Sequence, residues 1–327
     1  MANRYIDDKY LSSYNLEKIK KNVTILGNAK NEQLKQFVKS LNQRNIKNSI
    51  QYAIELHISG YFDNVLAKLT NVYFNEINLA QPKAAIYLCQ FLLYYNDKYT
   101  YSFKKNHPLT LINDIRIRNF MCFFISICCL SNQRKLPKLI KINDEDFDLK
   151  RRKKGLVSKN LNLVSKYLYK EDPKEIIIPF SEIVNLIKRS DIVDREQTII
   201  YWLSWIYEYE KKYHNNSLLV KHRNIPKVDT KYCRDFVWIV WEILIDNVSS
   251  EYRKIMMALN NMFKNKFTKT AKKSKNYMII AGIYLCVNSL PKIKVEITPE
   301  VYARSNLESL KSSIYYKEVF TMAAFQN

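Results

Sequence analysis

Glycine occupies only four of the 327 positions in this chain, which restricts the folds that the chain can adopt. Glycine opens the tight turns of β-hairpins and lets a backbone approach a bound phosphate, because it tolerates dihedral angles that other residues avoid. A sheet with many hairpins is therefore not expected, and glycine-rich nucleotide-binding loops are nearly excluded. Hydrophobic residues make up 47% of the chain, which is enough for a sizeable core and argues against a disordered basic protein.

Apolar residues recur with helical spacing along most of the chain. Ile46, Ile50, Ile54 and Ile58 form one stripe, and Gly60 follows as a helix C-cap. Further helices are predicted at residues 32–41, 62–73, 82–95, 113–130, 156–169, 179–188, 195–213, 229–248, 250–263, 275–289 and 307–325. The pattern predicts an all-α fold, either a multi-helix bundle or an irregular α-solenoid.

The least regular part of the chain separates two helical lobes. Residues 132–159 contain a proline, the acidic run 144–148 and the basic run 150–154, so we expect a charged linker or loop there. A polar N-terminal arm is predicted at 1–30, an N-terminal helical lobe at 31–131 and a C-terminal helical lobe at 160–327. Residues 95–108 are expected to form a polar connection. Short extended pieces are allowed at 175–178 and 293–297, where β-branched residues cluster.

The chain carries the signs of a protein that stays in a reducing compartment. No signal peptide is recognisable in residues 1–25, and the most apolar run, 120–130, is about half the length that a bilayer requires. The six cysteines have no CxxC spacing and lie in apolar helical patterns, as free buried thiols do. We therefore expect an intracellular protein without a membrane partner or a disulfide framework.

Sequence motifs for catalysis are missing. The four histidines are scattered, no HExxH or paired CxxC occurs, and the Gly-rich motifs of nucleotide enzymes are absent. The acids of the run 144–148 could converge on metal ions in a nuclease, but a solvated acidic loop, or one that shields the basic run 150–154, is the favoured interpretation. We expect no enzyme, no cofactor and no metal site.

The strongest functional signal is positive charge, because the net charge is +22 at pH 7. Two clusters concentrate it: Lys264, Lys266, Lys269, Lys272, Lys273 and Lys275 in the first, and Lys150, Arg151, Arg152, Lys153 and Lys154 in the second. Clustered like charges are costly unless water or an anionic partner covers them, so the predicted partner is a nucleic acid, DNA or RNA, held by its phosphates. A solvated Lys-rich surface, favoured by AT-rich codon usage, is the alternative.

Aromatic residues accompany the first cluster. Phe263, Phe267 and Tyr277 alternate with its lysines and with hydroxyl-bearing residues, as in grooves that hold a nucleic-acid backbone or single strand.

Two similar segments, 201–208 and 237–242, each place two tryptophans three residues apart on one helix face. These tryptophans form either a surface that stacks on bases or a partner, or a helix–helix contact in the core; the core interpretation is favoured.

A family resemblance rests on the segments 50–61, 172–179 and 201–208. In them the chain resembles an uncharacterised helical protein family of nucleocytoplasmic large DNA viruses. The resemblance implies a virus factory or virion as the location, and a role in viral genome replication, transcription or packaging. We therefore expect a non-enzymatic nucleic-acid-binding protein. The alternative is a structural virion or assembly protein, or a polymerase-complex subunit, that binds acidic protein partners in a viral protein complex.

Overall fold

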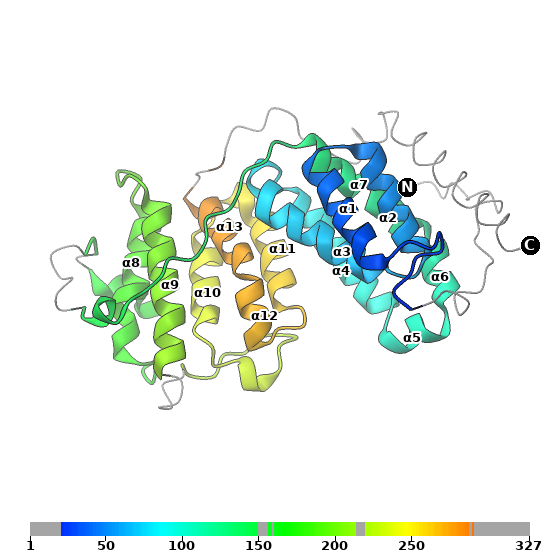
Figure 1. Cartoon of the computed structure of the whole chain (residues 1–327). Coiled ribbons are helices and arrows are strands. Elements are labelled where there is room, and N and C mark those ends of the chain that lie inside the picture. Colours follow the sequence, from blue (N-terminus) through cyan, green and yellow to red (C-terminus); the bar gives the residue numbers. More distant parts are fainter. Residues whose placement is uncertain (1–20, 150–155, 159, 214–219, 288–289, 291–327) are drawn as a thin grey trace, which may run out of the picture. The chain divides into compact units, whose positions relative to one another are not determined.

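A computed structural model describes residues 21–149, 156–158, 160–213, 220–287 and 290, and these residues form an all-α protein without a β-strand (Figure 1). The predicted fold class is therefore confirmed. The chain divides into two compact units. Within the described part, unit 1 comprises residues 21–84 and 90–134, and unit 2 comprises residues 85–89 and everything from residue 135 onward.

Unit 1 is built from seven α-helices in the residues that the structure describes. They are α1 (Lys30–Asn42), α2 (Ile46–Ile58), α3 (Phe62–Val72), α4 (Ala84–Lys98, except for its residues 85–89, which belong to unit 2), α5 (Tyr101–Asn106), α6 (Pro108–Asn113) and α7 (Ile115–Leu130). A π-helical turn, Tyr73–Ile77, and a 3₁₀ turn, Asn78–Ala80, continue α3. Helices α1, α2 and α3 pack on α7, whose residues from 120 to 129 are all buried, so α7 forms the centre of this unit.

Two sequence signals fix the ends of α2. The side chain of Asn45 accepts a hydrogen bond from the amide of Asn48 at the N-terminus, and Gly60 follows the C-terminus with a φ of +83°. Inside the helix, Nε2 of the buried His57 lies 3.3 Å from the carbonyl oxygen of Leu111. Burial lowers the pKa of His57 to about 3. His57 is therefore a neutral core residue.

The segment that precedes α1 is held on unit 1 by a buried carboxylate. Glu55 accepts hydrogen bonds from the hydroxyl of Thr24 at 2.5 Å and the amide of Asn28 at 2.9 Å, and the Ile25 amide donates to Ser59. Residues 21–29, which belong to the predicted N-terminal arm, are therefore attached to the helical body. The rest of that arm, 1–20, lies outside the described residues.

Unit 2 consists of further helices and a long non-helical segment. Its α-helices are α8 (Ile177–Lys188), α9 (Arg195–Tyr213), α10 (Val237–Asn247), α11 (Arg253–Lys264), α12 (Lys269–Ser274) and α13 (Asn276–Cys286). Helix α13 packs against α9, α10 and α11, and α8 packs against α9. Residues 135–143 run along α9, where the amide of Ile140 donates to the hydroxyl of Ser204. This part of the predicted linker therefore belongs to unit 2.

The tryptophans lie in the core of unit 2. Trp202, Trp205, Trp238 and Trp241 are each at most 3% exposed. Trp205 stacks on Tyr209 at 4.7 Å between ring centroids, and the other helix places Trp238 and Trp241 against Phe263. The core interpretation is confirmed, and the alternative of a tryptophan surface for bases or a polymerase partner is wrong.

Four local predictions differ from the structure. Residues 95–108 contain the end of α4 and the short helix α5, because Thr100 caps a new helical turn through its hydroxyl. In place of the predicted helix 156–169, the structure has only a 3₁₀ helix, Leu161–Tyr167. The predicted helix 229–248 begins later, because residues 229–236 form a 3₁₀ turn and a loop before α10. Residues 175–178 are helical. The predictions at 293–297 and 307–325 lie outside the described residues.

The positive φ of Gly60 at the end of α2 can be tested by substitution. Replacing Gly60 with Ala should lower the free energy of unfolding by about 1 kcal/mol, because the φ of +83° is unfavourable for a residue with a Cβ atom. No atom lies within 4 Å of such a Cβ, so the effect is conformational and not steric. Gly60→Asn, which tolerates this conformation better, should lose less. Urea denaturation followed by circular dichroism measures both; equal stability of all three proteins would contradict the account.

Candidate nucleic-acid interface

The first basic cluster spans the end of α11, the turn after it, and α12 in unit 2. Lys266, Lys269 and Lys273 are exposed, and Lys264 is half-buried. The turn is tight: Lys266 has a φ of +50°, and the amide of Phe267 donates to the carbonyl of Lys264. Thr268 then caps α12 by accepting a hydrogen bond from the Ala271 amide. The second cluster, Lys150 to Lys154, lies outside the described residues.

Lys272 does not face solvent with its neighbours. Its ammonium group forms ion pairs with Glu210, in the last turn of α9, and with Asp235, at 2.7 Å. It also lies 4.6 Å from the ring centroid of Tyr207. The side chain is buried and both carboxylates are largely buried. The prediction that Lys272 contacts phosphate is therefore wrong, because its charge is already neutralised inside the protein.

The charges around Lys272 are not balanced, since two carboxylates share one ammonium group. Burial disfavours the charged form of Lys272, but Asp235 and Glu210 outweigh this and raise its pKa. Burial, together with the negative charge of Asp235, raises the pKa of Glu210 to about 7, although Lys272 acts in the opposite direction. Glu210 therefore exchanges its proton near neutral pH, while Lys272 stays charged.

Lys275 also has an internal role. Its ammonium group donates to the carbonyl oxygens of Met262, at 3.2 Å, Phe263, at 3.3 Å, and Asn265. These carbonyls end α11 and have no partner within the helix, so Lys275 satisfies them. Burial, with the nearby charge of Lys266, lowers the pKa of Lys275 to about 8. We therefore assign Lys275 to the C-terminal cap of α11.

The aromatic residues of the cluster are not available for stacking on bases. Phe263 and Phe267 are 0% and 5% exposed, and their rings contact each other at a centroid distance of 5.4 Å. Phe267 also packs on Trp238 at 4.7 Å. The expectation that these two rings line a nucleic-acid groove is wrong, because they anchor the α11–α12 turn in the core. Tyr277 is half-buried.

The outward side of α11 extends the exposed charge. Lys254, Met257, Asn261 and Lys264 are spaced three or four residues apart, so they share one side of the helix. We call Lys254, Lys264, Lys266, Lys269 and Lys273 the basic face. Sequence reasoning missed Lys254, although the helical spacing of the apolar residues in α11 places it on the polar side.

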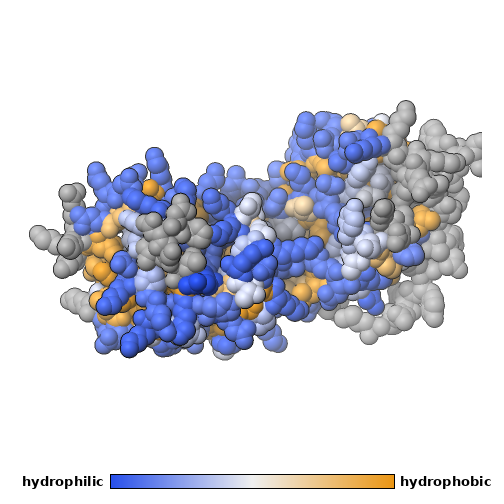
Figure 2. Space-filling model, turned by 90° about the horizontal axis from the view of Figure 1, so that it is seen from below, coloured by the Kyte–Doolittle hydropathy of each residue, from blue (hydrophilic) through white to orange (hydrophobic). Residues whose placement is uncertain are grey.

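The basic face has few negative charges near it in sequence. No aspartate or glutamate occurs between Glu251 and Glu296. In the described part of the chain, no ion pair joins Lys254, Lys266 or Lys273 to a carboxylate. Figure 2 shows, from below, that hydrophilic residues dominate the visible surface of the molecule and that apolar residues form small scattered groups. The basic face is therefore positive and solvated.

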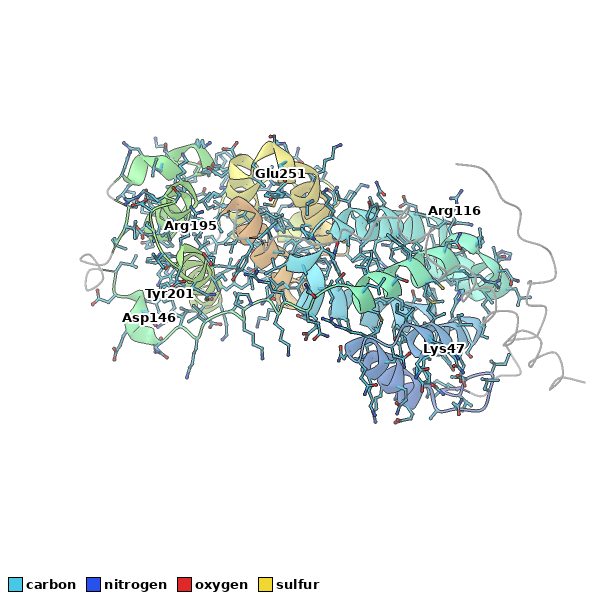
Figure 3. All side chains as sticks on the ribbon, turned by 90° about the horizontal axis from the view of Figure 1, so that it is seen from above. Lys47, Arg116, Asp146, Arg195, Tyr201 and Glu251 are labelled. Carbon is cyan, nitrogen blue, oxygen red and sulfur yellow. The ribbon has the colours of Figure 1, made fainter. Side chains whose placement is uncertain are left out.

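The acidic run 144–148 serves to attach its own segment to α9. The 3₁₀ helix Asp144–Phe147 (η5) is closed by Asp146, which accepts a hydrogen bond from the Asn143 amide. Tyr201 and Trp205 donate hydrogen bonds to Asp146, and Lys212 pairs with Asp144 at 2.5 Å. Figure 3 shows Tyr201 and Asp146 near each other. No three His, Cys, Asp or Glu side chains converge as metal ligands among the described residues.

Within the described residues, no helix has both the length and the apolar composition needed to cross a membrane. Comparison with protein-family models, curated proteins and solved structures finds no match. The resemblance to a helical family of large DNA viruses therefore stays a prediction.

Replacing Lys272 with Met tests the internal role of this residue. Removing the ammonium group leaves the carboxylate of Asp235 buried beside Glu210 without a cation, so the free energy of unfolding should fall by about 3–5 kcal/mol at neutral pH. The control is Lys273→Met on the exposed side of the same helix, which should change stability by less than about 0.5 kcal/mol. Urea unfolding followed by tryptophan fluorescence measures both. Similar small effects of the two substitutions would refute the ion-pair assignment.

The raised pKa of Glu210 predicts how stability depends on pH. The folded protein holds this proton more tightly than the unfolded chain, so stability falls as the pH rises from about 4.5 through about 7. Glu210→Gln removes the proton equilibrium beside Lys272, Asp235 and Tyr207. Its stability relative to the native protein should therefore be greater at pH 8 than at pH 5, by on the order of 2 kcal/mol. Parallel stability–pH profiles would contradict this.

Proposed function

We propose that this protein binds nucleic acid non-enzymatically, through contacts between its basic face and the phosphate backbone. The observation that carries the proposal is the exposure of Lys266, Lys269 and Lys273 after the internal lysines of the cluster have been assigned. Each exposed lysine that meets a phosphate releases condensed counterions, which gives affinity without sequence preference. The net charge of +22 adds long-range attraction for a polyanion.

The dimensions of the basic face support contact with several phosphates. Ten residues separate Lys254 from Lys264 along α11, which corresponds to about 15 Å of helix axis. A duplex rises about 3.4 Å per base pair, so this length matches about four base pairs. Lys266, Lys269 and Lys273 extend the face into the turn and α12. A single duplex or a single strand laid along it would meet several ammonium groups.

The chemistry of the face favours backbone contacts over base recognition. Its polar groups are ammonium groups that bind phosphates as point charges, and Phe263 and Phe267 are buried beneath it. Stacking on bases therefore has no support from these rings. We propose binding that is indifferent to base sequence at this face. Together with the predicted family resemblance, this is consistent with a proposed intracellular role in viral genome replication, transcription or packaging.

Charge reversal tests the proposal directly. Replacing Lys266, Lys269 and Lys273 with Glu should weaken binding to all sequences alike and reduce the slope of log affinity against log salt by about 0.7–0.9 per lost phosphate contact. The control is Lys170→Glu, Lys174→Glu and Lys188→Glu, which makes the same change in net charge at other exposed positions of unit 2. Fluorescence anisotropy measures both. An equal loss in the control would mean that net charge alone matters, and unchanged binding would exclude the basic face.

A further inference from the structure

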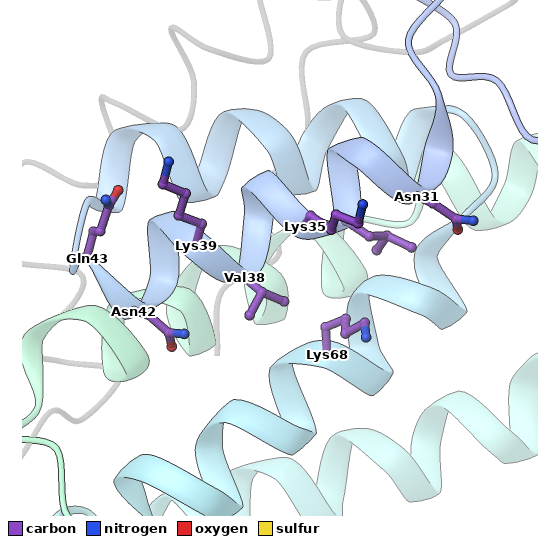
Figure 4. Close-up of a pocket in the computed structure, with 8 residues that line it drawn as sticks. Asn31, Lys35, Val38, Lys39, Asn42, Gln43 and Lys68 are labelled. Atoms are coloured by element: carbon purple, nitrogen blue, oxygen red, sulfur yellow. The ribbon is translucent and has the colours of Figure 1, made fainter.

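Unit 1 has a hollow between α1 and α3, separate from the basic face. Its volume is about 710 Å³, within the range of about 300–1,000 Å³ typical of small-molecule sites. Figure 4 shows the two helices on either side and Val38 between them. Lys35 and Lys39, one turn apart on α1, and Lys68 from α3 line the hollow. All three lysines are exposed.

Positive charge dominates this hollow, although one nearby carboxylate, Glu32, pairs with one of its lysines. Asp63, on α3, binds Lys104 at 2.7 Å. Glu32, on α1, pairs with Lys35 at 3.5 Å, and the exposure of both side chains makes this pair weak. Among the described residues, no carboxylate pairs with Lys39 or Lys68, and none lines the hollow. The occupant that this charge complements is an anion.

The remaining lining residues favour a nucleotide over a simple anion. Val38 presents apolar surface, against which a base or sugar can pack. Asn42, one turn from Val38, supplies a side-chain amide, which both donates and accepts hydrogen bonds and therefore matches the edges of bases. Phosphate, sugar and base each find a complementary group in one hollow. The basic face of unit 2 offers only groups that bind phosphate.

We propose that the α1–α3 hollow is a second nucleic-acid site, which holds a nucleotide of a single strand with its phosphate on Lys68 and its base against Val38. This site goes beyond the phosphate contacts proposed for unit 2, because it adds contacts to the base. A single strand is the class that fits, since its bases are unpaired and can turn into a hollow.

Thiol footprinting of the full chain tests this site. All six native cysteines are buried, and burial raises the pKa values of Cys129 and Cys286 to about 11 and 12, so they react slowly with N-ethylmaleimide. Three single variants place a reporter thiol at chosen positions: Val38→Cys in the hollow, Met257→Cys on α11 between lysines of the basic face, and Ser102→Cys on α5 as the control. The probe is oligodeoxythymidylate of about 20 nucleotides, longer than a typical single-strand site.

The three thiols separate the two proposals. At a probe concentration ten times its Kd, alkylation of Val38→Cys should slow about tenfold, because only the unbound fraction reacts, while Ser102→Cys stays unchanged. Protection at Met257→Cys alone overturns the hollow and leaves the basic face supported. Protection at Val38→Cys alone supports the hollow and overturns the basic face. If polyphosphate at equal phosphate concentration protects Val38→Cys as strongly as the oligonucleotide, the nucleotide assignment is wrong and the hollow binds anions in general.

Discussion

The buried contact of Lys272 with Glu210 and Asp235 is the interaction on which the surface of unit 2 most depends. Burying a charge is costly unless it is paired and hydrogen-bonded, and here one ammonium group meets two carboxylates and an aromatic ring. The contact joins the short helix α12 to the end of α9 and to the loop before α10. A six-residue helix is not stable alone, so this anchor, with the buried rings of the α11–α12 turn, fixes where Lys269 and Lys273 project.

Five of the six lysines of one sequence cluster therefore divide into two kinds. Lys272 neutralises buried carboxylates and Lys275 completes the end of a helix, so both contribute to the fold. Lys266, Lys269 and Lys273 remain in solvent, where mutual repulsion is reduced by water and salt or by a bound polyanion. Lys272 and Lys275 fix the position of the backbone from which the exposed lysines project into solvent. Stability and the exposure of positive charge are thus linked in this segment through neighbouring residues.

Hydrophobic periodicity was sufficient to predict most of the fold. The stripe from Ile46 to Ile58 and the Gly60 cap correspond to α2, and the predicted helix 195–213 has the bounds of α9. Burial of the tryptophans followed from their apolar neighbours. Short helices were the weak point, because α5 has too few residues to show a period and depends on the cap at Thr100. The irregular segment 135–143 was recognised, but its attachment to α9 rests on a hydrogen bond between residues 64 apart in the chain.

The candidate site was predictable only as a region of charge. Nothing local distinguishes Lys272 from Lys273, since the carboxylates that bury Lys272 lie 62 and 37 residues away. Phe263 and Phe267 read equally well as stacking platforms and as core residues until Trp238 and Trp241 are placed against them. The lysines of the α1–α3 hollow come from two helices, so they do not form a cluster in the sequence. Tertiary contacts therefore decide which charges are structural and which are exposed.

We propose that the exposed positive charge binds a nucleic acid. The most direct test is a fluorescence-anisotropy titration of the full chain with single- and double-stranded DNA and RNA at low and physiological salt. The account predicts saturable binding that weakens with salt, persists at physiological salt and differs among these ligands. Weak binding to all of them that disappears near physiological salt would contradict the account and direct attention to an acidic protein partner.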